Sequence, residues 1–119
     1  CIRLWGSDKR AGEVLETCQA WRPVDHMIIY NVAGDSDAQA MIADGRTVLA
    51  AIPGVRGVFA GEAVKDDAGY RYSWNVRFCH PDVIDSYRDH PDHVEFANKR
   101  FRPVAGDRIS IDFKEILSC

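Results

Sequence analysis

Residues 69–78, GYRYSWNVRF, decide the fold of this chain. Aromatic and apolar side chains alternate with polar ones along the stretch, which is the two-residue period of a β-strand with two different faces. The apolar face must pack against helices, and the polar face must meet water or a partner. We therefore predict that one set of side chains faces the helices, namely Tyr72, Trp74, Val76 and Phe78, while the other faces away, namely Arg71, Ser73, Asn75 and Arg77.

The N-terminal part of the chain predicts two helices with one strand between them. Residues 7–21 carry apolar side chains at helical spacing and predict a short amphipathic helix. Residues 26–35, HMIIYNVAGD, are mostly apolar and predict a strand that is buried on both faces. Asp35 or Ser36 is then placed to cap a helix with one apolar stripe, which Pro53 ends.

The rest of the chain predicts a hairpin, two short helices and a last strand. A β-like segment at 55–64 leads through a polar turn into the strand at 70–78. Two helical stretches follow, each with a proline at its first helical position, Pro81 and Pro91, and residues 108–113, RISIDF, alternate as a strand. The order β-α-β-β-α-β, behind an extra N-terminal helix, predicts an α+β fold of the ferredoxin-like type.

Length and composition indicate one soluble domain. The 119 residues are 46% hydrophobic and 28% charged, with a net charge of −3. Because charges of both signs are mixed and no apolar run reaches membrane length, we expect neither a nucleic-acid nor a membrane partner. Four cysteines without a CxxC pair, and no signal-peptide pattern, favour a reduced, cytoplasmic protein. We expect Cys18 and Cys79 to be buried, and Cys1 and Cys119 to pair only if the chain ends meet.

The stretch SYRDHPDHVEF, residues 86–96, sets two histidines around a proline. Pro91 at the first helical position places His90 at the helix start, where a capping role is favoured over metal binding. His90 and His93 have an i, i+3 spacing, but no third zinc ligand stands nearby in the sequence. His93 lies one turn inside the helix, and we predict that it faces the sheet together with Val94, Phe96, Ala97 and Phe101.

His93 and Tyr87 together have the chemistry of an acid-base site. A histidine with a near-neutral pKa can take a proton from an acidic carbon, and a phenol O–H can donate to the oxyanion that results. Either residue can instead be an amphipathic side chain whose polar tip is satisfied by backbone or water. His26, at a strand start, is open to two interpretations as well, a hydrogen-bonded edge residue or a pocket wall.

Four segments carry a resemblance to a known family: His26 opening the first strand, IPGV at 52–55, GYRYSWNVRF at 69–78 and YRDHPDHVEF at 87–96. Together they resemble the stress-responsive A/B barrel domain, or Dabb, family of small dimeric α+β barrels. The resemblance implies a homodimer, in which two sheets pair to form a barrel with the helices outside. Residues 1–25 then form an extension with a short helix, and residues 26–119 form the barrel domain.

The resemblance also implies a function and a site. The family includes olivetolic acid cyclase and hydroxynitrile lyases, which implies cyclase- or lyase-like acid-base chemistry without a cofactor. Tyr87 and His93 stand at the catalytic positions and His26 at a pocket position, whereas a further pocket histidine of the cyclase is Tyr72 here. If the aromatic face of the sheet is only partly filled, we expect Ile28, Tyr30, Tyr72, Trp74 and Phe96 to line a cavity for a small apolar or aromatic ligand; the alternative is an ordinary core. Some relatives hold a metal ion through backbone carbonyls, which correspond here to those of Leu49, Ile52 and Val55.

Two functional hypotheses remain open on the sequence. The first is a dimeric barrel that binds a small carbonyl compound and uses the His/Tyr pair for acid-base chemistry. The second is a non-catalytic, stress-responsive dimer with a filled core. A cavity of about 300 Å³ or more opening beside His93 favours the first, and a solid aromatic core there favours the second.

Overall fold

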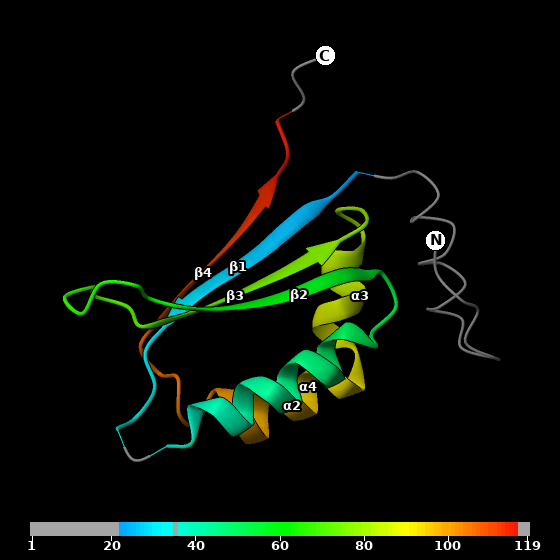
Figure 1. The fold of residues 1–119 in the computed structure, drawn as a ribbon. Helices are drawn as coiled ribbons and strands as arrows, with labels where there is room; N and C mark the ends of the chain where they lie inside the picture. Colours follow the sequence, from blue (N-terminus) through cyan, green and yellow to red (C-terminus); the bar gives the residue numbers. More distant parts are fainter. Residues whose placement is uncertain (1–21, 35, 117–119) are drawn as a thin grey trace.

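The computed structural model describes residues 22–34 and 36–116, and it has the predicted ferredoxin-like α+β fold. Four antiparallel strands form one sheet in the order β2-β3-β1-β4, and the helices cover one of its two faces (Figure 1). The elements are β1 (Val24–Tyr30), α2 (Ala38–Ala50), β2 (Val55–Glu62), β3 (Tyr72–Phe78), α3 (Val83–Asp89), α4 (Pro91–Phe96), the π-helical turn η1 (Ala97–Phe101) and β4 (Arg108–Lys114). The helix predicted for residues 7–21, and Cys1, Cys18 and Cys119, lie outside the described residues.

Strand β3 presents its two faces as its alternation predicts. Trp74, Val76 and Phe78 are 2% exposed or less and pack beneath the helices. Arg77 points to the other side of the sheet, where its guanidinium forms two hydrogen bonds with the carboxylate of Asp25 on β1. The strand is shorter than the alternation suggests, because it begins at Tyr72.

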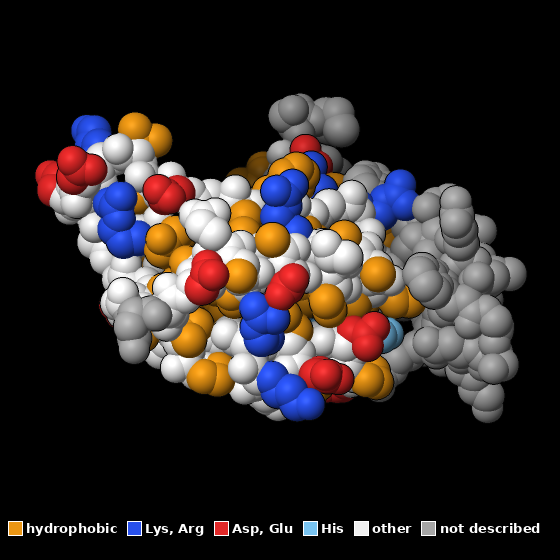
Figure 2. Space-filling model, turned by 60° about the horizontal axis from the view of Figure 1, so that its bottom comes forward, with side chains coloured by type: hydrophobic (Ala, Val, Ile, Leu, Met, Phe, Trp, Pro, Cys, Tyr) orange, Lys and Arg blue, Asp and Glu red, His pale blue; other side chains and the backbone are white. Residues whose placement is uncertain are grey.

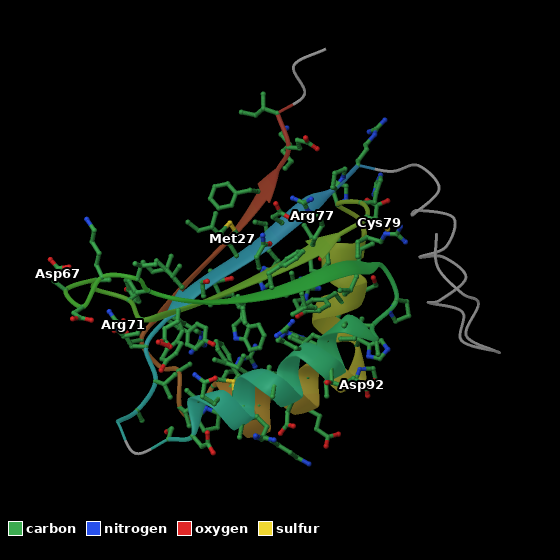
Figure 3. The ribbon with its side chains drawn as sticks, viewed as in Figure 1. Met27, Asp67, Arg71, Arg77, Cys79 and Asp92 are labelled. Carbon is green, nitrogen blue, oxygen red and sulfur yellow. The ribbon has the colours of Figure 1, made fainter. Side chains whose placement is uncertain are left out.

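The face of the sheet turned away from the helices is apolar and open. Met27 and Ile29 on β1 are each 37% exposed there, so the prediction that this strand is buried on both faces is wrong for the single chain. No helix of the described residues covers this side, and Figure 3 shows Met27 and Arg77 projecting from it. Four further large apolar side chains are exposed on it, those of Phe59, Ile109, Ile111 and Phe113.

Helix α2 packs closely on the core through a glycine. Its N-cap is Asp37, whose side chain accepts a hydrogen bond from the amide of Ala40 at 3.0 Å, so the cap lies beyond the predicted Asp35 or Ser36. Gly45 is buried in the middle of the helix, where a Cβ would lie 2.5 Å from the Phe96 ring and 2.8 Å from the Trp74 ring. The missing side chain therefore sets how near α2 comes to α4 and the sheet.

Helix α4 begins at Pro91 as predicted, whereas the start of α3 and the orientation of Val94 differ from the prediction. Helix α3 begins at Val83 rather than at Pro81, with Asp82 as its N-cap, and the amide of Asp82 donates a hydrogen bond to the His80 ring at 3.0 Å. Val94 is 40% exposed, so its predicted inward orientation is wrong, whereas Phe96 and Phe101 are buried as expected. The outer surface of these helices and of α2 carries charges of both signs between small apolar areas (Figure 2).

Two further expectations concern burial and hydropathy. Cys79 is a free, fully buried cysteine, and burial raises the pKa of its thiol. In the described part of the chain, no helix has the length and apolar character that a membrane crossing requires.

Candidate active site

A cleft of about 390 Å³ opens between the helical layer and the β1–β4 side of the sheet. Its apolar lining comes from Ile28, Phe78, Ile84, Ala97 and Phe101. Its polar lining comes from the strands through His26, Arg108, Ser110 and Asp112, and from the helical layer through Tyr87, Arg88, His93 and Arg102. The cleft thus combines an apolar body with a concentration of ionisable groups, as ligand sites commonly do.

Strand β4 explains why this side of the sheet is a cleft and not a core. Its alternation is the reverse of that of β3, because the residues facing the helical layer are polar and the residues facing the open side are Ile109, Ile111 and Phe113. Polar side chains at those positions cannot seal a hydrophobic core without losing hydrogen bonds to water. The polar residues of RISIDF that face the helical layer therefore indicate a cleft. Only a strand was predicted for this segment from its sequence.

His93 and Tyr87 lie together in the cleft, with ring centroids 4.4 Å apart. The Nδ1 atom of His93 is 3.0 Å from the backbone carbonyl oxygen of Arg88. Because a carbonyl oxygen can only accept, Nδ1 carries the hydrogen, and in the neutral ring Nε2 is left with the free lone pair. The ring is thereby oriented as a base with one defined acceptor atom.

The environment keeps His93 neutral. Burial lowers the pKa of His93, and the bond to the Arg88 carbonyl opposes that shift only in part. The positive charge of Arg102 lowers this pKa further. A histidine of this kind is unprotonated at neutral pH, which is the state that a general base requires.

His90 caps the helix, as predicted, and this cap leaves the Arg88 carbonyl available. The ring Nδ1 of His90 accepts a hydrogen bond from the amide of Asp92 at 3.1 Å. In an uninterrupted helix that amide would bond to the carbonyl of residue 88, four positions earlier. The break between α3 and α4 therefore diverts the Asp92 amide, and the freed carbonyl orients His93.

Tyr87 is arranged as a hydrogen-bond donor. It is 4% exposed, and burial raises its pKa well above the ordinary phenol value, so the hydroxyl remains protonated at any physiological pH. Its ring also packs against Phe78, at 4.8 Å between centroids, and against the edge of His26 at 6.0 Å. Three aromatic neighbours on separate elements hold the phenol in place.

His26 is paired with an acidic residue that the sequence analysis did not identify. Its Nδ1 lies 2.5 Å from Oδ1 of Asp112, which is its direct partner in the β1–β4 register. The carboxylate accepts from Nδ1–H, which again leaves Nε2 as the second ring atom for exchange with a ligand. Structure therefore brings three predicted residues, His26, Tyr87 and His93, into one cleft and adds Asp112 to them.

The predicted substrate-binding residues divide into two groups. Ile28 lines the cleft, and with Trp74 and Phe96 it also lines an adjoining apolar recess of about 30 Å³. Tyr30 and Tyr72 line neither space. Tyr30 is fully buried in an aromatic cluster with Tyr72, Trp74 and Phe101.

The predicted metal ligands lie between the end of α2 and the start of β2. The Leu49 carbonyl accepts from the amide of Ile52 at 3.2 Å, and the Ile52 carbonyl accepts from the amide of Val55 at 3.1 Å. Both oxygens are thus already engaged as acceptors, so the set fits at most a hard cation bound through neutral carbonyls. Among the described residues, no cluster of three or more His, Cys, Asp or Glu side chains is arranged for a metal ion.

Fold and cleft together define a ferredoxin-like α+β protein with a histidine- and tyrosine-containing pocket on the helical side of its sheet. The chain belongs to the stress responsive A/B barrel domain (Dabb) family, whose sequence profile matches residues 24–115. No curated protein sequence matches the chain significantly.

Solved structures show the same fold at low sequence identity. A Dabb family protein from Mesorhizobium loti with a ferredoxin-like fold is 23% identical, with a TM-score of 0.71 over 81% of this chain and 99% of that chain. A dimeric ferredoxin-like protein from Thermobifida fusca is 21% identical, with a TM-score of 0.67 over 80% and 92% of the two chains. The hydroxynitrile lyase of Passiflora edulis is 14% identical, with a TM-score of 0.70 over 82% and 96%.

Proposed function

We propose that two copies of this chain pair through the open faces of their sheets, and that the cleft in each copy binds a small apolar or aromatic carbonyl compound. Six large apolar side chains exposed on one sheet face are typical of an interaction surface. The side-chain Oδ1 of Asn75 is buried on that face without a hydrogen-bond partner among the described residues, and a second copy can supply one. The dimeric relative from Thermobifida fusca supports the same arrangement.

The chemistry that we infer for the cleft is proton transfer at a carbon next to the carbonyl. Nε2 of His93 takes the proton, and the hydroxyl of Tyr87 donates a hydrogen bond to the oxygen on which negative charge develops. His93 then returns the proton to carbon or to a leaving oxygen. His26, oriented by Asp112, assists by holding a second proton at Nε2. These steps use only side chains of the cleft.

The observation that carries the proposal is the open cleft of about 390 Å³ beside His93, which exceeds the size that favours a ligand site. The aromatic cluster around Tyr30 fills the neighbouring part of the core, which is the feature that favours the alternative of a filled, non-catalytic dimer. That a relative of this fold in Passiflora edulis is a hydroxynitrile lyase supports catalysis on such a scaffold.

Proton abstraction can be measured directly as hydrogen–deuterium exchange. Acetophenone is incubated with the protein in D₂O, and loss of the methyl proton signal is followed by NMR. We expect the intact protein to accelerate exchange and the His93→Ala variant to lose about 10²-fold or more of that acceleration. His80→Asn is the matched control, because His80 precedes α3 and lies outside the cleft, and asparagine retains an acceptor for the Asp82 amide. Exchange at the same rate in the intact protein and His93→Ala would contradict the assignment of the base.

A further inference from the structure

The cleft carries more positive charge than the rest of the chain would suggest. The protein has a net charge of −3, yet three arginines line the cleft against one carboxylate, that of Asp112. That carboxylate is already engaged by the ring of His26. An excess of guanidinium groups in a cavity of an acidic protein indicates that the ligand carries negative charge.

The three arginines are not equivalent, because only Arg88 is neutralised. Its guanidinium forms ion pairs at 3.1 Å with both Asp85 and Asp89. Arg102 donates instead to the side-chain oxygen of Asn98, and Arg108 donates to the carbonyl oxygen of Ala105.

Those two acceptors are uncharged, so they leave the guanidinium charges of Arg102 and Arg108 uncompensated. Neither side chain forms an ion pair with a carboxylate in the described ranges, 22–34 and 36–116. Each guanidinium also has five N–H donors, of which a single contact uses one.

The side chains of Arg102 and Arg108 both line the cleft, and the local backbone structure explains their positions. In a regular α-helix, residue 102 would lie roughly 140° around the axis from Ala97. The π-helical turn changes this, because the amide of Arg102 bonds to the carbonyl of Ala97 at 2.8 Å, five residues earlier. Arg102 is thereby brought to the side that lines the cleft, while Arg108 stands on β4 with its guanidinium 6.0 Å from the centre of the Phe101 ring.

We propose that Arg102 and Arg108 bind a carboxylate of the ligand, so that the cleft takes a small carbonyl compound that also bears a carboxylate group. This inference rests on the proposed function and names its substrate class. The planar guanidinium presents paired donors that match a carboxylate, and two such groups on facing elements fix its position.

The positions of the charged residues along β4 also indicate which end of the ligand lies at which end of the cleft. Arg108 and Asp112 are four residues apart on β4, which separates the two ends of the cleft by roughly 13 Å. The ligand's carboxylate is attracted to the Arg108 end and repelled from the Asp112 end. Its carbonyl therefore lies toward His26, Tyr87 and His93, where the proton is transferred.

Binding of a matched pair of probes tests the inference. The probes are 4-oxo-4-phenylbutanoate and its methyl ester, which differ only in the negative charge, and their affinities are measured by isothermal titration calorimetry. We expect the acid to bind about 10-fold or more tightly than the ester. The Arg102→Gln/Arg108→Gln double variant should bind the acid and the ester with equal affinity. Arg46→Gln, a change of charge on α2 outside the cleft, should keep the preference for the acid.

Several results would overturn the inference. The first is equal affinity of the intact protein for the acid and the ester, and the second is a preference for the acid that persists in the double variant. The others are no binding of the acid at about 10 mM, and competition by inorganic phosphate for the cleft that is as strong as that of the acid. A folded double variant is shown by an unchanged circular dichroism spectrum and by measurable binding of the ester. Failure of the proposed chemistry is distinguishable, because His93→Ala lacks exchange activity but should still prefer the acid.

Discussion

His26 and Asp112 stand directly opposite each other on neighbouring antiparallel strands, and their side chains meet at 2.5 Å on the face that lines the cleft. The pairing register of β1 and β4 therefore positions this pair, and no loop has to close for it to form. A shift of β4 by one residue would turn Asp112 to the open face, away from His26.

Replacing Asp112 tests whether this pair takes part in the chemistry. We expect Asp112→Asn to lower the exchange rate of acetophenone by about 10-fold, because the neutral amide stabilises a protonated His26 less than the carboxylate does. Affinity for the neutral ester probe should be unchanged. Asp92→Asn, which alters an exposed carboxylate outside the cleft, is the control. An undiminished rate in Asp112→Asn would remove His26 and Asp112 from the mechanism.

The lowered pKa of His93 predicts how both activity and stability depend on pH. The exchange rate should fall on acidification with a midpoint below the ordinary histidine pKa of 6.5, as His93 becomes protonated. Between the lowered pKa and 6.5 the unfolded chain binds more protons than the folded one, so the stabilisation is complete above 6.5 and is lost as the pH falls through the folded pKa. Urea unfolding at pH 5 and pH 7 should show a smaller pH effect in His93→Gln than in the intact protein.

Two substitutions of His90 separate its capping role from a role in chemistry. His90→Ala removes the acceptor of the Asp92 amide and should cost about 1 kcal/mol of unfolding free energy. The released amide can then compete for the Arg88 carbonyl, which should shift the ring ¹⁵N signals of His93 in NMR. His90→Asn supplies a new cap and should restore both. If the alanine variant leaves stability and the His93 signals unchanged, the capping account is wrong.

Gly45 should resist replacement by alanine, although alanine is the better helix former. The new Cβ would lie 2.5 Å from the Phe96 ring, and the strain should exceed the gain in helix propensity by about 1–3 kcal/mol. Urea unfolding measures the difference. Gly106→Ala is the matched control, since its Cβ would meet nothing within 4 Å. A stabilised Gly45→Ala protein would show that α2 can move away from the sheet at no cost.

The open sheet face predicts the oligomeric state. Light scattering at micromolar concentration should give about twice the 13.4 kDa of one chain, with an interface on the order of 1,200 Å² or more. Ile111→Asp places a charge on this face and should yield the single chain. Val64→Asp, at a 97% exposed position in the hairpin, should leave the dimer intact. A monomeric wild-type protein would contradict the pairing.

The fold was predictable because its signals are repeated along many residues. The alternation from Tyr72 to Phe78 identifies a strand and both of its faces without any tertiary information. Element limits were less accurate, since single hydrogen bonds such as that from Ala40 to Asp37 set them. Met27 and Ile29 show another limit: hydrophobicity does not reveal whether helices or a second chain will cover a face.

The site was predictable only in part, for similar reasons. The proline between His90 and His93 indicates which ring caps and which lies within the helix, and the resemblance to a family directed attention to Tyr87 and His26. Arg102 was missed because it reaches the cleft through a π-helical turn, which has no clear side-chain signature. Asp112 was missed because its role depends on a partner 86 positions away in the sequence.

The proton acceptor of this cleft is oriented by a main-chain atom, since the bond from His93 ends on the Arg88 carbonyl oxygen. Every amino acid carries that oxygen, so substitution at position 88 preserves the orientation of the base. The side chain of the same residue lines the cleft. Mutation at this one codon can therefore alter which compounds are admitted while leaving the base in place, which makes position 88 a favourable starting point for the divergence or laboratory evolution of new specificities.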